Sequence, residues 1–173
     1  GTVDAGTLAT DSVTAAKLKS DAITGADLPA GSVLQVVSTT ESVLYSTTTS
    51  DFSARATGLS ATITPRSTSS KILVTIGAIV GFQYNNTYGK TAIYRSISGG
   101  ASTNNLTGET AGFGSVGNGA YQFCNTISYL DSPSSTSAIT YSLTFAFSAG
   151  GVGIVYIGSN AGSSTITLME IAV

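Results

Sequence analysis

The chain has 173 residues, a net charge of −2, 42% hydrophobic residues and only 9% charged residues. This balance excludes an intrinsically disordered chain, which is poor in apolar residues and rich in net charge. Its seven basic residues form no stripe that could neutralise phosphates, and no apolar run approaches the roughly 20 residues of a membrane-spanning helix, so neither nucleic-acid binding nor membrane insertion is expected.

Residues 1–31 form a repetitive leader in which TVDAGTL, SVTAAKL and AITGADL follow at intervals of ten residues. Their apolar residues are spaced by five, which matches neither the helix period nor the strand period. Each copy is therefore expected to combine a short extended piece with one helical turn, and such a unit has no core of its own. The leader is predicted to associate with identical chains; the alternative is a flexible linker. The candidate association residues are Val3, Leu8, Val13, Leu18, Ile23 and Leu28.

From Ser32 onward, apolar, β-branched and aromatic runs alternate with turn clusters such as SGGASTNN and DSPSSTS. Serine and threonine contribute 52 residues, whereas good helix formers are scarce. About nine strands are expected, within residues 32–38, 42–48, 52–63, 71–84, 90–97, 121–130, 138–147, 151–158 and 164–173. Residues 32–173 are therefore predicted to form one all-β domain, a jelly-roll-like antiparallel β-sandwich.

Two of the expected strands differ in their patterns. In residues 139–147 the odd-numbered residues are apolar and the even-numbered ones small or polar, which is typical of a half-buried strand. The last run is apolar on both faces, because Met169 and Ile171 lie opposite Ile166 and Leu168. Such a strand is usually covered on both sides, so we expect the second cover to be a neighbouring subunit. Glu170 is predicted either to reach water or to be partly buried beside Arg or Lys.

The chain offers little for catalysis or metal binding. It has no histidine, and its one cysteine, Cys124, lies in a strand-like run, so the usual base for a nucleophile is missing. Its nine acidic residues lie in separate segments, and only an oxygen-ligated ion such as Ca²⁺ would suit them. The glycines of GFGSVG (112–117) have the spacing of a dinucleotide-binding loop, but a strand follows where that site needs a helix. We therefore predict no enzyme, no cofactor and no metal.

One segment, FQYNNTYGK (82–90), combines aromatic and amide side chains between two strand-like runs. Flat aromatic faces with amide and hydroxyl partners suit sugar recognition, whereas the alternative is a hairpin tip whose tyrosines only cover the sandwich. The candidate receptor-binding residues are Tyr84, Asn85, Asn86, Tyr88, Asn104, Asn105 and Asn118.

The SVTAAKL-type repeats, GSVLQVV, TITPRSTSSKILV and the closing TITLMEI resemble the C-terminal parts of bacteriophage tail-fibre and related virion-fibre proteins. The resemblance extends over nearly the whole chain and is weakest in residues 82–125. It implies a homotrimeric fibre tip, in the tail or the capsid of a virion, whose slender shaft leads into a β-rich knob that contacts a host surface.

These observations lead to a functional hypothesis with two alternatives. The first is a non-enzymatic, homotrimeric distal fibre domain that attaches to a glycan or protein of the host surface. Since the chain does not begin with Met, we expect a preceding region that joins other virion proteins. The second is a purely structural virion part, such as a capsid or collar fibre or a decoration protein. A polysaccharide-degrading enzyme is the third.

Overall fold

The computed structural model describes residues 27–82, 88–109, 112–113, 115–116, 122–148, 155–157 and 162–173. These residues form eleven β-strands and no α-helix, which confirms the all-β prediction. None of them belongs to a helix long and apolar enough to cross a membrane. The leader residues Val3, Leu8, Val13, Leu18 and Ile23 lie outside the described residues.

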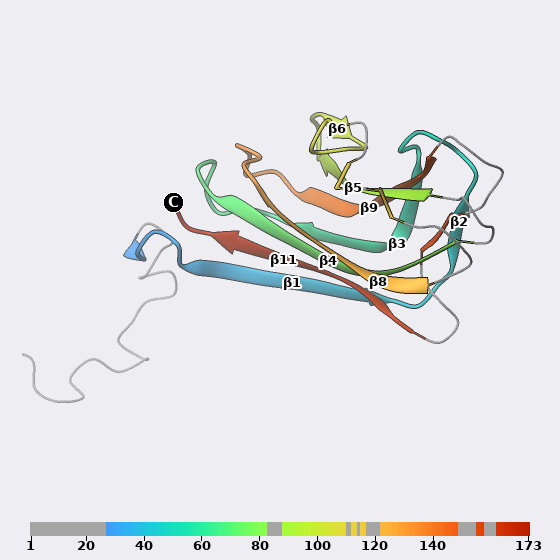
Figure 1. Cartoon of the computed structure of the whole chain (residues 1–173). Coiled ribbons are helices and arrows are strands. Elements are labelled where there is room, and N and C mark those ends of the chain that lie inside the picture. The colour runs from blue at the N-terminus through green and yellow to red at the C-terminus, as the bar shows by residue number, and fades with distance from the viewer. Residues whose placement is uncertain are drawn as a thin grey trace, which may run out of the picture.

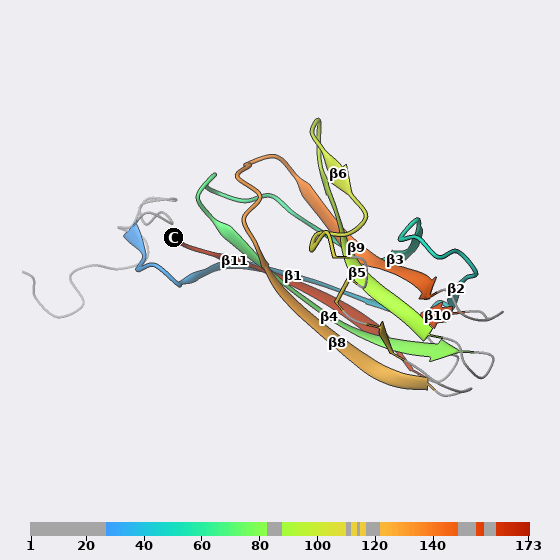
Figure 2. The same cartoon turned by 45° about the horizontal axis from the view of Figure 1, so that its top comes forward.

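The first sheet is built around the long strand β4 (Lys71–Phe82), a run of β-branched and apolar residues. β8 (Gln122–Asp131) pairs with one edge of β4, and β11 (Ser164–Ile171) and then β10 (Val155–Ile157) pair with the other. β1 (Val33–Glu41) adds to β11, and β2 (Tyr45–Thr47) adds to β10. The sheet is thus four strands wide, and Figure 2 shows β8, β4, β11 and β1 side by side.

The second sheet has the order β3 (Ala54–Ile63), β9 (Ile139–Ser148) and β5 (Tyr88–Ile97). Two short strands, β6 (Ser102–Thr103) and β7 (Ser115–Val116), pair with the free edge of β5. All strand pairs in both sheets are antiparallel. The sequence had predicted a turn and a loop where β6 and β7 form.

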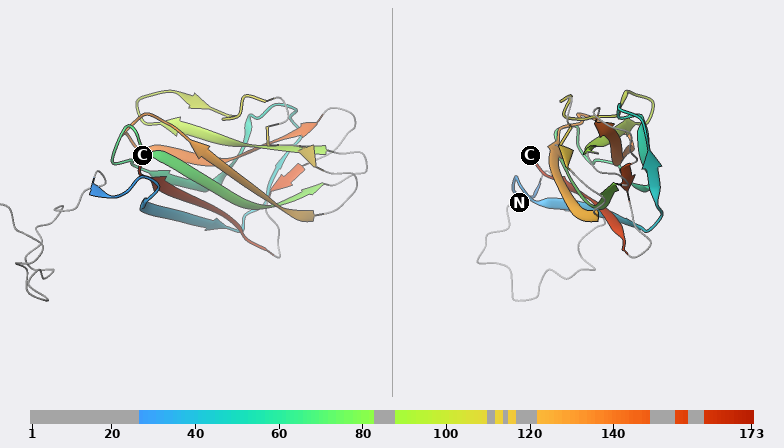
Figure 3. Two further views of the ribbon diagram at one scale, coloured as in Figure 1. Left: turned by 60° about the vertical axis from the view of Figure 1, so that its left-hand side comes forward. Right: turned by 45° about the vertical axis from the view of Figure 1, so that its right-hand side comes forward.

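The two sheets lie face to face, as the side and end views show (Figures 1 and 3), so the predicted β-sandwich is confirmed. Successive long strands alternate between the sheets: β3, β5 and β9 belong to one and β4, β8 and β11 to the other. The finer jelly-roll assignment stays a prediction, which this alternation favours.

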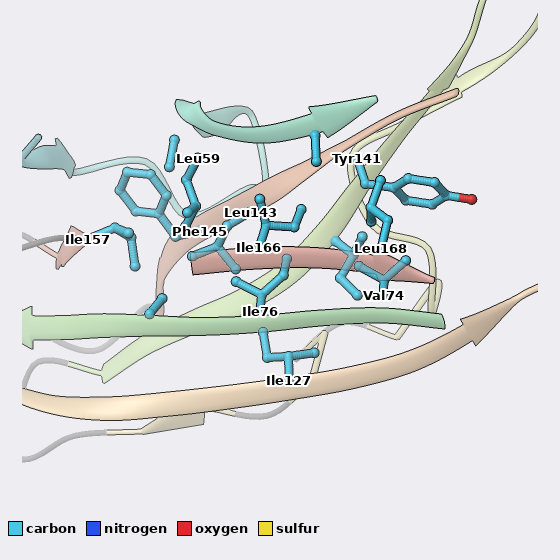
Figure 4. Close-up of a cluster of buried hydrophobic side chains, with 14 of the residues drawn as sticks. Leu59, Val74, Ile76, Ile127, Tyr141, Leu143, Phe145, Ile157, Ile166 and Leu168 are labelled. Carbon is cyan, nitrogen blue, oxygen red and sulfur yellow. The ribbon is translucent and has the colours of Figure 1, made fainter. Parts of the chain in front are cut away.

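The core lies between the sheets because alternate side chains of each strand point inward. Val74, Ile76, Ile166 and Leu168 of the first sheet face Leu143 and Phe145 of β9 in Figure 4, and all six are buried. Each such side chain contributes roughly 1.5–3 kcal/mol when it leaves water. In the same view the hydroxyl of Tyr141 points out of this apolar cluster at one end.

A buried polar network at that end joins the two sheets. Asp131, at the end of β8, accepts hydrogen bonds from Arg95 Nη1 on β5 at 2.8 and 2.9 Å and from Tyr141 Oη on β9 at 2.7 Å. Burial, and then the hydrogen bond to the Asp131 carboxylate, raises the pKa of Tyr141 well above its ordinary value. The Asp131 carboxylate therefore holds partners from two strands of the opposite sheet.

Glu170 lies on the core side of β11 and is fully buried. Its carboxylate accepts hydrogen bonds from Gln35 Nε2 at 2.6 Å and from the backbone N–H of Arg66 at 2.7 Å. The prediction of a carboxylate in water is therefore wrong, and the partners are an amide and a backbone group instead of a cationic side chain. The Thr64 carbonyl also accepts from Gln35, so this group fastens the turn after β3 to the first sheet.

The start and the end of the sandwich are joined at one pole. Gly31 N–H donates to the Ala172 carbonyl at 2.8 Å, and Ala172 N–H donates to the Ser32 carbonyl at 2.9 Å. Figure 1 accordingly places the C-terminus beside the start of the described chain. From this pole β1 runs antiparallel to β11, with a register shift between Val33 and Gln35 and then unbroken pairing from Gln35–Glu170 to Glu41–Ser164.

Strand β9 departs from the expected half-buried pattern, since its even-numbered residues Ser142, Thr144 and Ala146 are buried as well. The segment after β5 covers part of this outer face. Thr144 Oγ1 donates to the Asn104 carbonyl at 2.6 Å, and Leu106 N–H donates to the Ile93 carbonyl at 3.0 Å. In Figure 1 this segment, which carries β6, rises above β5 and β9 on the side away from the first sheet.

Candidate functional site

A polar pocket of about 300 Å³ lies on the outer face of the second sheet. It crosses three strands, because register places Ser60 of β3, Ser142 of β9 and Tyr94 of β5 in one row. The neighbouring row contains Thr62, Thr140 and Ser96. The residues that line the pocket are Arg55, Thr57, Ser60, Tyr94, Ser96, Thr140 and Ser142. Hydroxyl groups from three strands therefore converge on one concave surface.

A bulge in β3 forms one border of this pocket. The pairing of β3 with β9 shifts between Ala56 and Ser60. Ala56 lies opposite Leu143 and Ser60 lies opposite Ser142, so three extra residues of β3 fit between two neighbouring residues of β9. Such an insertion re-aims side chains near a site. The bulge is anchored from the other sheet, since Gly58 N–H donates to Tyr45 Oη at 2.8 Å. It leaves Arg55 and Ser60 on the same face of the sheet, with Leu59 buried in the core.

The Arg55 guanidinium lies over the Tyr94 ring, with its carbon 4.2 Å from the ring centroid. A cation over an exposed aromatic face gains roughly 0.5–1 kcal/mol. A hydrogen bond from the Ser96 hydroxyl, helped by Arg55, holds the pKa of the Tyr94 phenol below its ordinary value. This pair places a positive charge and an aromatic face at the same pocket.

The hydroxyl of Ser142 lines the same pocket without a hydrogen-bond partner, and the residue is only 1% exposed. Leaving a buried hydroxyl unpaired costs about 1–3 kcal/mol. Buried polar groups in native proteins nearly always have a hydrogen-bond partner. A ligand in the pocket could supply that partner for the Ser142 hydroxyl.

The pocket offers hydroxyl groups, an aromatic ring and a guanidinium for binding a ligand. None of the seven lining residues is acidic, so the pocket holds no pair of carboxylates. Asp131 and Glu170 flank Ile72 in one row of the first sheet, but both are buried and occupied by hydrogen bonds of the chain. Among the described residues no three His, Cys, Asp or Glu side chains group as metal ligands.

Most of the sequence-predicted receptor residues cannot be placed beside this pocket. Tyr84, Asn85, Asn86 and Asn118 lie outside the described residues, as does the side chain of Tyr88 at the start of β5. Their role stays a prediction.

Asn104 and Asn105 lie in the described loop after β6. Asn104 is exposed, and its carbonyl accepts the hydrogen bond of Thr144. The Asn105 side chain is occupied within the loop: its amide donates to the Glu109 carbonyl at 2.7 Å, and its oxygen accepts from Thr107 Oγ1 at 2.7 Å. Asn105 therefore stabilises the loop that covers β9.

Gly112 is the glycine of GFGSVG that lies within the described residues, and its importance is in its backbone conformation and close packing. Its φ is +59°, and a Cβ at this position would collide with the Thr91 carbonyl and approach Phe52 to 2.9 Å. Phe113 N–H donates to the same Thr91 carbonyl at 2.8 Å. Glycine is needed here for close approach of the loop to β5, and a strand, β7, follows it.

The outer face of the first sheet is different, because an apolar row crosses it. Register aligns Val36 of β1, Met169 of β11, Leu73 of β4 and Leu130 of β8. Val36 and Leu130 are 55% and 48% exposed, and Met169 is half-buried. We name these four residues the apolar row. Of the other candidate association residues, Ile171 is half-buried next to it on β11, and Leu28 is 40% exposed.

No protein-family model and no curated protein matches the chain. Function therefore has to be inferred from the chemistry of the surfaces, since a β-sandwich by itself hosts many functions.

Proposed function

We propose that the protein is a non-enzymatic, homotrimeric distal domain of a phage fibre that attaches the virion to a host surface. The observation that supports this most is that the outer faces of the two sheets differ in their chemistry. One outer face has a hydroxyl-lined pocket with an aromatic ring and an arginine, and the other has the apolar row. A receptor-binding trimer needs both a ligand site and a surface for association.

The apolar row is the proposed contact between subunits of the knob. Exposed Val36 and Leu130 lie in line with Met169 across the full width of the sheet. Covering such residues removes apolar area from water, which favours association by about 25 cal/mol per Å². The leader, whose apolar spacing also predicts association with identical chains, comes directly before β1 in the sequence, and β1 contributes Val36 to this row.

Association is tested by multi-angle light scattering of the full chain, with a mass three times the 17.3 kDa of one chain as the expected result. Val36→Asp should shift the population to smaller species, because it places a charge in the proposed contact. Thr40→Asp is the matched control, since Thr40 is exposed on the same strand with the same outward phase. A parent chain with the mass of a monomer would contradict the trimer.

Attachment is tested by incubating the labelled full chain with a panel of bacterial strains and measuring cell-bound protein. The proposal expects saturable binding to a subset of strains, and competition with virions that infect them. If the trimer forms but binds no strain, the alternative of a structural capsid or collar fibre or decoration protein is favoured. Release of reducing sugar from strain polysaccharide would instead support the enzyme.

A further inference from the structure

The pocket on the second sheet carries an uncompensated positive charge. Arg55 is the one charged side chain among its seven lining residues, and it is exposed. The ion pair that the described residues do form, between Arg95 and Asp131, lies at the inner side of the same sheet. Arg55 therefore has an aromatic neighbour but no carboxylate partner within the described residues, and its guanidinium can accommodate an anion in two parallel hydrogen bonds.

The remaining groups of the pocket point to a ligand that is rich in hydroxyls. Thr57, Ser60, Ser96 and Thr140 line it. The Ser96 hydroxyl already donates to Tyr94, and the Thr140 hydroxyl shares a hydrogen bond with Thr62 at 2.8 Å, but each oxygen can still accept a hydrogen bond from a ligand. The unpartnered oxygen of Ser142 lies nine-tenths or more buried among them. A ligand hydroxyl or ring oxygen that reaches Ser142 would satisfy an oxygen that the chain itself leaves unpaired.

We infer that this pocket binds an acidic sugar, a hexuronate unit of a surface polysaccharide, with its carboxylate on Arg55 and its hydroxyls on the serines and threonines. The inference rests on the proposed attachment function and names the ligand class of that site. Tyr94 supplies the flat face against which the pyranose ring packs. Arg55 leaves the Tyr94 ring for the carboxylate at small cost, because an exposed cation–π contact is weak and the core is not disturbed.

A hexuronate suits the site better than a bare phosphate. Phosphate would occupy Arg55 but would leave the row of hydroxyl groups and the Tyr94 face without partners. A neutral sugar would use the hydroxyl row but would leave the guanidinium unpaired. A ligand with both an anionic group and several ring hydroxyls, as a hexuronate has, engages all the groups that line this surface.

The test is isothermal titration of the full chain with tetragalacturonate, its methyl ester and inorganic phosphate. Tetragalacturonate is expected to bind at least about tenfold more tightly than the ester, since a hydrogen bond to a charged group is worth that factor or more. Arg55→Met should lose that advantage, and Ser142→Ala should weaken binding several-fold without lowering the thermal midpoint. Arg66→Met is the matched control, because Arg66 is exposed but lies outside the pocket.

Each outcome separates this inference from the attachment proposal. The acidic-sugar assignment would be overturned if tetragalacturonate and its methyl ester bound with equal affinity. It would also be overturned if the Arg55→Met variant bound tetragalacturonate as tightly as the parent chain, or if inorganic phosphate bound the pocket as tightly as tetragalacturonate. If the chain still binds cells in that case, attachment stands and its ligand lies elsewhere. If neither cells nor any saccharide is bound, attachment itself fails. Loss of cell binding in Arg55→Met, with Arg66→Met unaffected, supports both.

Discussion

Replacing Asp131 by alanine is expected to lower the free energy of unfolding by about 3–4 kcal/mol. The Arg95 guanidinium would lose a partner held at 2.8 and 2.9 Å. Breaking a buried pair costs about 3–5 kcal/mol, but the Arg95 side chain is 22% exposed, so we count about 2 kcal/mol for this part. The Tyr141 hydroxyl would lose its acceptor in a buried site, which adds about 1–2 kcal/mol.

The measurement is urea unfolding followed by far-UV circular dichroism, at one protein concentration because association shifts apparent stability. Glu109→Ala is the control, since Glu109 is exposed and its substitution should stay within about 0.5 kcal/mol. The same change at Asp131 is then repeated in an Arg95→Met background. There it should cost at least about 1 kcal/mol less, because no cation remains to be left unpaired.

Two results would contradict this prediction for Asp131→Ala. A loss below about 1 kcal/mol in the single variant would mean that the network contributes no more than an exposed ion pair. An equal loss in the parent and in the Arg95→Met background would mean that Asp131 acts independently of Arg95. A lower dependence of the free energy of unfolding on urea concentration would instead indicate that less surface is exposed on unfolding. The free energy of each variant would then be calculated from its own midpoint and its own slope.

Three further predictions concern other buried groups. Burial raises the pKa of Tyr141 in the folded state, whereas the unfolded residue ionises near pH 10. The contribution of Tyr141 to the free energy of unfolding is therefore complete below pH 10 and falls above it by about 1.4 kcal/mol per pH unit. In Tyr141→Phe the free energy of unfolding should decrease less steeply above pH 10, by that slope. Glu170→Ala should cost about 2–3 kcal/mol by freeing the turn at Arg66, measured by urea unfolding, and Glu170→Gln should cost less. Gly112→Ala should destabilise by more than 1 kcal/mol, whereas Gly77→Ala, whose added Cβ meets only an ordinary contact, should not; equal thermal midpoints would contradict this.

The sequence was sufficient to place the long strands. Runs such as 71–84 and 164–173 correspond to β4 and β11 within two residues at each end, because β-branched residues and turn clusters act locally. The short strands β6 and β7 were not predicted, since they consist of Ser, Thr and Val in a polar loop. Their pairing depends on the neighbouring edge of β5, which no local pattern reveals.

The pocket could not be predicted from the sequence, for a similar reason. Ser60, Tyr94 and Ser142 are far apart in the chain, and only the register of β3, β9 and β5 aligns them. The bulge in β3 also shifts that register in a way that local propensity does not encode. A signal was present in the small polar residues at even-numbered positions of 140–144, which leave room above a strand. Identifying a pocket there required knowing which strands lie beside it.

The hydrogen bonds that join the Gly31 and Ser32 end of the sandwich to Ala172 also determine its mechanics. A pull on the leader directed along β1, with the knob held away from this pole, would act parallel to the pairing of β1 with β11. The pairs from Gln35–Glu170 to Glu41–Ser164 would then be sheared together, instead of opening one after another from an end. Resistance to such a pull is a matter of the unfolding rate and not of the equilibrium free energy. The pairing of β1 with β11, which is the first pairing to bear such a pull, should therefore separate slowly.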